Sequence, residues 1–499
     1  MNTFNALPMN RAAVPLFSLE DFSQKVIKGA EQGERLLALW VLPHNYFTIY
    51  AALGQANTGG ISVFCAPLDK MTYPSLTPWC AQAHWFEREI AEQWAIIPEG
   101  HPWLKPIRFH RAYNHLRDAW GRLGKDIEPG LTDYYQVTGD EVHEVAVGPV
   151  HAGIIEPGHF RFQCCGETVL HLEISLGYQH RGLERRLARL PFRHRLAFVE
   201  TLAGDTSIGH GLAYCQAVEA LAGISAPFKG QEIRAIALEL ERLANHVGDL
   251  GALAGDVGYL PTASFCGRLR GDLLNLSALV CGSRFGRSWL AVGGVAFDIT
   301  PEQAQNMLDK IHNIEQDIKG AVELLWHTPS VMTRFELTGK LSRQAAADLG
   351  MVGVAARACG LLRDVRFEYP FDIYRFFNMP MSSWSSGDVF GRAYVRWGEI
   401  IHSLEFIKQR LRGLSLGPAR LACGPLKAGQ VVVSLVEGWR GEVCHIIFTD
   451  ERGEISDYKV VDPSFHNWAG LAYAMRGQQI SDFPLCNKSF NLSYCGHDL

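Results

Sequence analysis

The spacing of hydrophobic and polar positions divides the chain into two parts joined by a polar stretch. Residues 1 to about 122 hold short apolar runs with mixed helix and strand periods, including Arg35–Trp40 and Thr58–Cys65. The stretch from Gly124 to Glu141 contains a Pro-Gly pair, two tyrosines and five acidic residues, which is typical of a linker. A chain of 499 residues also exceeds what one hydrophobic core usually supports. We therefore predict an N-terminal domain at residues 1–122, a linker at 123–141 and a larger domain at 142–499.

Beyond the linker, the pattern predicts strands at both ends of the larger domain and helices between them. Glu144–Val150 and Phe160–Leu172 have strand character, with a turn in the second near residues 165–167. Apolar runs within Gln430–Thr449 indicate further strands. Helical periods cover Gln231–Leu253, Thr300–Trp326, Ser342–Leu362 and Phe390–Leu411. The fold class is therefore α+β, a small α/β domain followed by a mainly helical domain with N- and C-terminal β elements.

The predicted helix at residues 231–253 carries many polar side chains. Spacings of three, four and seven place several of them on one face: Glu239, Arg242, Asn245, His246 and Asp249. A solvated face with surface ion pairs explains this spacing as well as a functional cluster does.

The composition argues against several classes of protein. The net charge is only -5, so the basic footprint of a nucleic-acid-binding protein is missing. The richest early apolar stretch, Leu36–Leu53, is interrupted by His44, Asn45 and Tyr46, and no transmembrane segment is predicted. The N-terminus lacks the pattern of a secretory signal. We expect a cytoplasmic protein that reaches a membrane only through partner subunits.

Twelve cysteines are present, but none lies in a Cys-x-x-Cys pair. The adjacent Cys164 and Cys165 are poorly placed to chelate one metal ion. In a reducing cytoplasm, most of the twelve are expected to be small buried hydrophobic residues. No Walker loop or dinucleotide fingerprint occurs, so any chemistry on NAD(H) belongs to another subunit.

A polar cluster follows the first predicted strand of the larger domain. The segments Gly148–His151 and Glu156–Arg161 hold two imidazoles and a carboxylate, from His151, His159 and Glu156. Such groups can relay protons near neutral pH. A turn with surface histidines is an equally good explanation of the segment alone.

A second cluster, Leu172–Glu184, resembles a signature shared by the large subunits of energy-converting nickel–iron hydrogenases and the equivalent subunit of respiratory complex I. The Gly148–Arg161 loop resembles the hydrogenase version of the preceding hairpin. Later segments fit the same family in the expected order: Glu239–Leu243 with Asn245 and His246, Gly293–Val295, Asp364–Arg366, Gly387–Phe390 with Arg392, and Pro463–Phe465. Three N-terminal segments resemble the small complex I subunit that docks beside the large one: Tyr73–Thr77, Phe86–Glu89 and Gly100–Pro102. Formate hydrogenlyase-type hydrogenases carry the two units fused in this order.

The resemblance implies partners for this chain. His180 and Arg181 should face the terminal iron–sulfur cluster of a small partner subunit, where a positive group stabilises the reduced cluster. The imidazole would couple the cluster's potential to proton uptake. A purely structural pair at a helix end is the alternative for these two residues. Antiporter-like membrane subunits, and a peripheral position at the inner face of the cell membrane, follow from the same resemblance.

The sequence departs from the family where nickel would be bound. Nickel–iron hydrogenases use two Cys-x-x-Cys pairs, whose four thiolates suit such a centre. The aligned residues here are Ala203, Thr206, Ser493 and Gly496, and Cys495 lies one residue away from such a position. No metal site is therefore predicted.

Complex I also lacks these cysteines and uses the vacated space for a quinone headgroup. The resemblance implies that a hairpin histidine, here His151 or His159, and a tyrosine bind the quinone. The tyrosine's position is Gly204 in this chain, as it is glycine in hydrogenases. The sequence thus looks like a hydrogenase scaffold with an emptied metal site and without the usual quinone site.

These arguments select candidate residues for a polar site and its surroundings. Candidates for catalysis are His151, Glu156, His159, Glu173, Asp205 and Thr206; candidates for contact with a cofactor are His180, Arg181, Asp364 and Arg366. We expect the chain alone to bind no cofactor and the complex to pass electrons from the partner's iron–sulfur cluster to a quinone or another small acceptor, coupled to ion translocation. Two alternatives remain, a non-catalytic scaffold subunit and a nickel–iron hydrogenase large subunit whose cysteine positions are misaligned.

Overall fold

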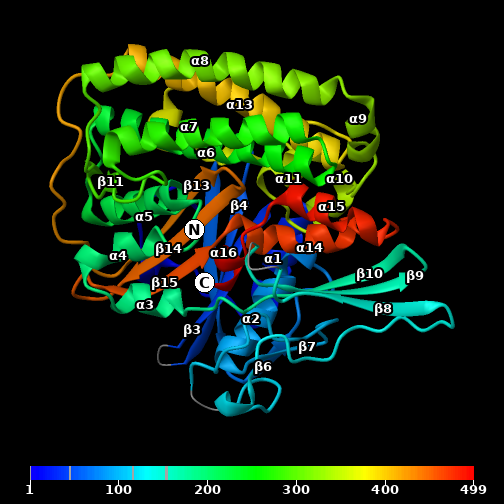
Figure 1. The fold of residues 1–499 in the computed structure, drawn as a ribbon. Helices are drawn as coiled ribbons and strands as arrows, with labels where there is room; N and C mark the ends of the chain where they lie inside the picture. Colours follow the sequence, from blue (N-terminus) through cyan, green and yellow to red (C-terminus); the bar gives the residue numbers. More distant parts are fainter. Residues whose placement is uncertain (1, 44–45, 115–116, 152–154) are drawn as a thin grey trace.

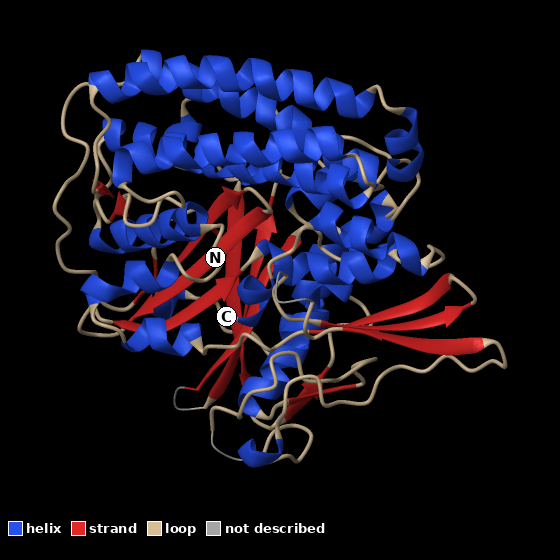
Figure 2. Cartoon of the chain, viewed as in Figure 1, coloured by secondary structure: helices blue, strands red, loops and turns tan. Residues whose placement is uncertain are grey.

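The computed structural model describes residues 2–43, 46–114, 117–151 and 155–499. Figure 1 shows a layer of long helices above central strands, and a β-ribbon that projects to one side. Figure 2, coloured by secondary structure, shows that most helices gather on one side of the central strands. The predicted α+β class is confirmed.

The N-terminal part forms an antiparallel sheet in the order β1-β5-β4-β3. Its strands are β1 (Asn2–Phe4), β5 (Gly60–Leu68), β4 (Phe47–Gln55) and β3 (Arg35–Pro43), and α1 (Leu19–Glu31) and α2 (His84–Trp94) pack against it. The Ser18 hydroxyl caps α1 by accepting a hydrogen bond from the backbone N–H of Asp21. Residues 36–42 of β3 are all buried, which indicates cover on both faces of the strand. A short parallel pair, β6 (Thr72–Pro74) and β7 (Ile97–Glu99), completes this part.

The C-terminal sheet is completed by residues from the start of the chain. Its order is β15-β14-β13-β2, with β15 (Ile455–Val461), β14 (Gly441–Thr449), β13 (Gln430–Gly438) and β2 (Met9–Asn10). Met9 pairs with Val431 in antiparallel register. The Phe448 ring packs edge-on against Tyr50, with ring centroids 5.6 Å apart. The two sheets therefore share one hydrophobic core, and the predicted boundary at residues 123–141 stays a prediction.

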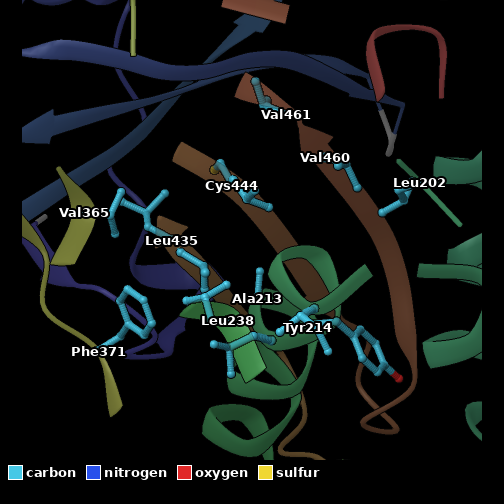
Figure 3. Close-up of a cluster of buried hydrophobic side chains, with 14 of the residues drawn as sticks. Leu202, Ala213, Tyr214, Leu238, Val365, Phe371, Leu435, Cys444, Val460 and Val461 are labelled. Atoms are coloured by element: carbon cyan, nitrogen blue, oxygen red, sulfur yellow. The ribbon is translucent and has the colours of Figure 1, made fainter. Parts of the chain in front are cut away.

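Long helices cover the C-terminal sheet. They are α5 (Ser207–Ala222), α6 (Phe228–Asp256), α7 (Leu260–Cys281), α8 (Pro301–Trp326) and α13 (Val389–Arg412). Figure 3 shows side chains that fill the space between helices and strands, among them Ala213 of α5, Leu238 of α6 and Leu435 of β13. The predicted helices near α6, α8 and α13 are confirmed. Helix α5 escapes the periodicity argument because nearly all of its residues are buried and no polar face marks it.

The polar side chains of α6 lie inside the protein. Glu239, Arg242 and His246 are 0% exposed, and Asp249 is 2% exposed. The explanation by a solvated face is therefore wrong. Arg242 pairs with Glu239 at 3.0 Å between Nε and Oε2, because a buried charge is costly without a partner.

A three-strand ribbon carries the histidine-rich loop. β8 (Val142–Val147), β9 (His159–Cys165) and β10 (Thr168–Ser175) lie in the order β10-β9-β8, which confirms the predicted strands and the turn between the last two. The connection from β8 to β9 contains His151 and Glu156. Residues 152–154 of the predicted loop lie outside the described residues.

The prediction of one helix at Ser342–Leu362 is wrong. This segment forms two short helices, α10 (Arg343–Asp348) and α11 (Gly353–Ala358). Gly350, between the two helices, and Gly353, the first residue of α11, have φ of +68° and +64°, which a right-handed helix cannot continue through. A side chain at Gly353 would also overlap the backbone carbonyl of Arg440.

The remaining elements are short, and no helix of the described residues is long and apolar enough to cross a membrane. They are β11 (Leu290–Ala291), β12 (Gly294–Val295), α3 (Leu183–Arg189), α4 (Phe192–Val199), α9 (Pro329–Phe335), α12 (Val365–Glu368), α14 (Pro463–Ala474), α15 (Phe483–Phe490), α16 (Tyr494–Asp498) and 3-10 turns at Arg11–Ala13, Ala81–Ala83, Gly124–Asp126, Asp372–Arg375 and Ile480–Asp482.

Candidate functional site

Two segments far apart in the sequence meet at the turn between β13 and β14. We call this cluster the Arg440 site; it consists of Asp205, Thr206, Arg440 and residues 491–496. Nη1 of Arg440 lies 2.6 Å from Oδ1 of Asp205 and 3.2 Å from Oγ1 of Thr206. Nε of Arg440 donates to the backbone carbonyl of Asn491. One guanidinium thus ties the segment before α5 to the segment that leads into α16.

The centre of the Arg440 site is an ion pair between the buried Arg440 and the half-buried Asp205. The Arg440 side chain is sandwiched against Trp439, with its guanidinium carbon 3.8 Å from the ring centroid. Burial alone would raise the pKa of Asp205, but the Arg440 guanidinium more than offsets this, and the pKa lies below its usual range. Asp205 is therefore ionised at neutral pH, and the two charges compensate each other.

The four positions where the predicted family carries nickel-binding cysteines do not form a metal site. Ala203 offers no donor atom, and the Thr206 hydroxyl lies 3.2 Å from Oδ1 of Asp205. The Ser493 hydroxyl caps α16 by accepting a hydrogen bond from the N–H of Gly496 at 2.9 Å. In the described residues, no group of three or more His, Cys, Asp or Glu side chains could hold a metal ion. A four-thiolate nickel centre does not fit the residues present.

Position 496 is also closed sterically. A Cβ atom on Gly496 would lie 2.7 Å from Oδ2 of Asp462, closer than non-bonded atoms approach. Any side chain at position 496 would have to displace the Asp462 carboxylate, which is 1% exposed.

Glu156 and Cys495 lie together at the edge of the Arg440 site. Oε2 of Glu156 accepts a hydrogen bond from the backbone N–H of Tyr494 at 3.3 Å. Burial and the nearby Glu156 carboxylate raise the pKa of Cys495 to about 12. The Cys495 thiol is therefore protonated at neutral pH and is a poor metal ligand or nucleophile.

The two hairpin histidines are held by loop backbone. Nε2 of His151 lies 2.9 Å from the carbonyl oxygen of Gly158, and Nδ1 of His159 lies 3.3 Å from that of Gly148. Burial lowers the pKa of His159. A Cβ atom on Gly158 would lie 2.6 Å from the ring of Tyr494, so the loop packs directly on the segment that enters α16.

Glu173 lies apart from the Arg440 site. Its carboxylate accepts hydrogen bonds from Nζ of Lys105 at 2.7 Å, Nε1 of Trp103 at 3.1 Å and the backbone N–H of Tyr135 at 2.8 Å. It lines a cavity of about 790 Å³ between the N-terminal part and the ribbon. The structure thus assigns Glu173 to that boundary.

Asp364 and Arg366 belong to a separate network of buried charges. Arg366 bonds Asp364 at 2.6 Å and Glu239 at 3.1 Å, and Arg357 pairs with Glu399. The charges of Arg366 and Arg357 lower the pKa of Asp364 against the opposing effect of burial. Their contacts are those of a structural core that joins α6, α12 and α13.

His180 and Arg181 lie on a basic surface. It surrounds a cavity of about 690 Å³ lined by His110, Arg111, His180, Arg181, Arg185, Arg186 and Arg189, among other residues. The His180 ring stacks on His110 of the N-terminal part, with centroids 4.5 Å apart. Burial, with a smaller contribution from His110, lowers the pKa of His180 to about 4. The positive charge of this surface at neutral pH therefore comes from its arginines.

Two known protein families match parts of this chain, and known proteins match most of it. Residues 256–427 match the family described as respiratory-chain NADH dehydrogenase, 49 Kd subunit, and residues 26–120 match the 30 Kd subunit family. The carbon monoxide-induced hydrogenase of Rhodospirillum rubrum is 31% identical over 353 residues, 70% of this chain and 97% of that protein. This chain belongs to the family of complex I and hydrogenase large subunits.

Other members of the family show the same relationship. Formate hydrogenlyase subunit 5 of Escherichia coli is 28% identical over 438 residues, 85% of this chain and 77% of that protein. NADH-quinone oxidoreductase subunit 4 of Thermus thermophilus is 30% identical over 370 residues, 68% of this chain and 90% of that protein. The predicted recognition of the family, including the fused N-terminal unit that resembles the 30 Kd subunit, is confirmed. The chain is therefore an oxidoreductase-related subunit.

Sequence reasoning brought together Asp205, Thr206 and Glu156 but missed the residues that connect them. Arg440 and Asp462 were not among the candidate site residues, although each is a charged residue within or at the end of an apolar segment. A charged residue in a predicted buried strand is a usable signal, because such charges persist only with partners. His210, a single histidine in an apolar segment, was not among the candidates either.

Proposed function

We propose that this chain works in a membrane-associated oxidoreductase complex at the inner face of the cell membrane. It would receive electrons from an iron–sulfur cluster of a small partner subunit and pass them, at the Arg440 site, to a quinone or another small acceptor. Antiporter-like membrane subunits would couple this reaction to ion translocation. Any reaction with NAD(H) would take place in another subunit.

The observation that carries the proposal is that the basic surface and the Arg440 site share the same two backbone segments. Arg181 donates to the backbone carbonyls of Thr201 at 2.9 Å and Leu202 at 3.1 Å, just before Asp205. Nδ1 of His180 lies 2.7 Å from the backbone carbonyl oxygen of Asp498, two residues after the 491–496 segment. A cluster docked on the basic surface would thus lie against the segments that build the site.

The charge of the surface suits an electron-donating partner. Arginines attract an acidic partner surface and stabilise a reduced cluster. The neutral His180 imidazole would bind a proton more readily once a cluster beside it gains an electron, which would link electron arrival to proton uptake.

The Arg440 site offers the groups that a carbonyl acceptor requires. The guanidinium of Arg440 and the hydroxyl of Thr206 can stabilise an oxygen atom that gains negative charge during reduction. Gly204 provides an open approach, because it is exposed and, among the described residues, a Cβ atom there would meet only Nη2 of Arg287, at 4.0 Å.

A scaffold role is the second candidate, and one observation favours it. The guanidinium of Arg440 already binds Asp205, Thr206 and Asn491, so it has a structural task without any acceptor. In a scaffold, alanine substitutions at His151, Glu156 and His180 would leave the function of the complex intact.

Measurements on the purified complex distinguish the catalytic role from the scaffold role. The first measurement is elemental analysis together with hydrogen uptake, where we expect iron without stoichiometric nickel and no hydrogen activity. Reduction of quinones and ion pumping are then compared in the wild type and Arg440→Lys, which keeps the charge but loses the planar fork. We expect about a tenfold or greater loss of reduction in Arg440→Lys, and none in Arg343→Lys on α10. A wild-type complex that reduces no quinone and pumps no ions would overturn the proposed activity.

A further inference from the structure

A continuous series of hydrogen bonds leads from the Arg440 site through the core. Oδ2 of Asp462 lies 3.0 Å from Nε2 of His210, and Nδ1 of His210 lies 3.0 Å from Nε2 of His445. Nδ1 of His445 lies 2.8 Å from the hydroxyl of Tyr458. We call these four residues the Asp462–Tyr458 chain. Both nitrogen atoms of both imidazoles take part, so the series has no gap.

The two ends of the chain lie in different surroundings. Asp462 abuts Gly496, where a Cβ atom would collide with its carboxylate, and it lies within electrostatic range of Arg440. Tyr458, at the other end, is one of the residues that line a cavity of about 310 Å³. His210 and His445 are 0% exposed, whereas Tyr458 is 7% exposed.

The chemistry of the groups fixes a direction for the hydrogen bonds. An ionised carboxylate only accepts, so Nε2 of His210 carries the proton that points to Asp462. When both imidazoles are neutral, Nδ1 of His210 accepts from Nε2–H of His445, and Nδ1 of His445 accepts from the Tyr458 hydroxyl. Burial, and then the neighbouring His210, hold the pKa of His445 well below its usual range. All donors then point from Tyr458 towards Asp462.

The geometry makes these residues one unbranched series. Each imidazole uses both of its ring nitrogen atoms, one as donor and one as acceptor. The neighbouring Tyr214 ring stacks on Tyr458 at 6.5 Å between centroids, but its hydroxyl takes no part in the series.

We propose that the Asp462–Tyr458 chain conducts protons between the Tyr458 cavity and the Arg440 site. Transfer of one proton breaks the Tyr458 O–H bond as Nδ1–H of His445 forms, and breaks Nε2–H of His445 as Nδ1–H of His210 forms. Nε2–H of His210 breaks as the carboxyl O–H of Asp462 forms, and water in the cavity restores the Tyr458 proton. One proton moves and no electron does. Use of that proton at the Arg440 site rests on the proposed acceptor reduction, but conduction itself does not.

The charged and titratable neighbours of the chain come from several elements. Arg440 lies near Asp462. At the other end, Cys215 of α5 and Arg195 of α4 lie near Tyr458, and Glu184 and Lys459 line the same cavity. Glu184 accepts from Nζ of Lys459 at 3.0 Å, which places a titratable pair beside the cavity.

The test uses the full chain labelled with ¹⁵N-histidine and needs no turnover. The exchange of the His210 and His445 ring N–H protons with solvent is followed by NMR. The signals are assigned with variants in which one of these histidines is replaced. We expect Tyr458→Phe to slow this exchange by a factor on the order of 10². Tyr214→Phe, the matched control, removes a hydroxyl from an adjacent buried tyrosine and should leave the exchange unchanged. His445→Gln should likewise slow exchange at His210.

Each outcome has a defined meaning. Exchange in Tyr458→Phe at the wild-type rate, or equal slowing in Tyr214→Phe, would overturn the proton path. In the assembled complex, quinone reduction should fall in Tyr458→Phe and show a larger solvent deuterium isotope effect. If the complex reduces no acceptor while Tyr458→Phe still slows exchange, the path stands and the proposed activity fails.

Discussion

The carboxylate of Asp462 occupies the space that a side chain on Gly496 would need. The two residues come from the start of α14 and from α16, and a Cβ atom at position 496 would lie 2.7 Å from Oδ2 of Asp462. Two hydrogen bonds hold Asp462 there. Its Oδ2 lies 3.0 Å from Nε2 of His210, and its Oδ1 accepts from the backbone N–H of Ser464 at 2.8 Å. A side chain at position 496 therefore requires Asp462 to move.

Gly496→Ala should lower the free energy of unfolding by about 1–3 kcal/mol, because the added methyl group must displace a fixed carboxylate. The matched control is Gly320→Ala in α8, an exposed helical glycine where no heavy atom of the described part of the chain lies within 4 Å of the added Cβ. There we expect stabilisation by about 0.5–1 kcal/mol. Urea unfolding monitored by circular dichroism measures both. Equal effects at the two positions would show that position 496 is open.

Gly204→Tyr should be tolerated, with a change in unfolding free energy of less than about 1 kcal/mol, because position 204 is exposed and open. The family resemblance places a quinone-binding tyrosine at this position in complex I. We therefore expect the variant complex to reduce quinones at a lower quinone concentration than the wild type. Gly204→Ala, which adds no phenol, is the control. A tyrosine variant that behaves like the alanine variant would exclude an acceptor near position 204.

Glu241→Gln should change how stability depends on pH. Glu241 accepts hydrogen bonds from the backbone N–H groups of Ile208 at 2.7 Å and Gly209 at 3.1 Å, and burial raises its pKa to about 8. An unfolded glutamate titrates near about 4.3, so between these values the folded protein binds the extra proton and stability falls as pH rises. The variant should lose less stability than the wild type from pH 5 to 8. Denaturant midpoints across this range measure the difference, with Glu323→Gln, on the exposed face of α8, as the control; superimposable curves for wild type and Glu241→Gln would refute the shift.

Arg186→Glu should weaken docking of the iron–sulfur partner subunit. Arg186 is exposed on α3 and lines the basic cavity, so charge reversal would oppose an acidic partner and slow association. We expect about a tenfold weaker association at low salt and a smaller difference at high salt. Arg343→Glu on α10, on the other side of the molecule in Figure 1, makes the same charge change elsewhere. Equal weakening by both variants would point to net charge and not to this surface.

Local patterns could predict much of the fold but little of the site's connections. The helix α8 could be predicted because apolar residues recur at helical spacing behind the Thr300 cap. The break between α10 and α11 depends on Gly353 meeting the turn at Arg440, which no local pattern contains. Asp205 and Thr206 could be selected as candidates because the order of the family motifs along the chain marks their segment.

The Asp462–Tyr458 chain lay beyond sequence reasoning for a physical reason. His210 and His445 are separated by 235 residues, and His210 and Asp462 by 252. Their contact depends on how α5 lies across the C-terminal sheet. Spacing within one helix or strand carries no information about that crossing.

The pairing of β2 with β13 has a consequence for synthesis of the chain. Residues 9–10 leave the ribosome about 420 residues before their partners at 430–431. At about 5–20 residues per second, translation alone leaves the N-terminal strand edge and the rings of Trp40 and Tyr50 without Phe448 for roughly 20–80 s. The nascent protein therefore leaves this aromatic face of the sheet uncovered until residues 430–448 have been synthesised.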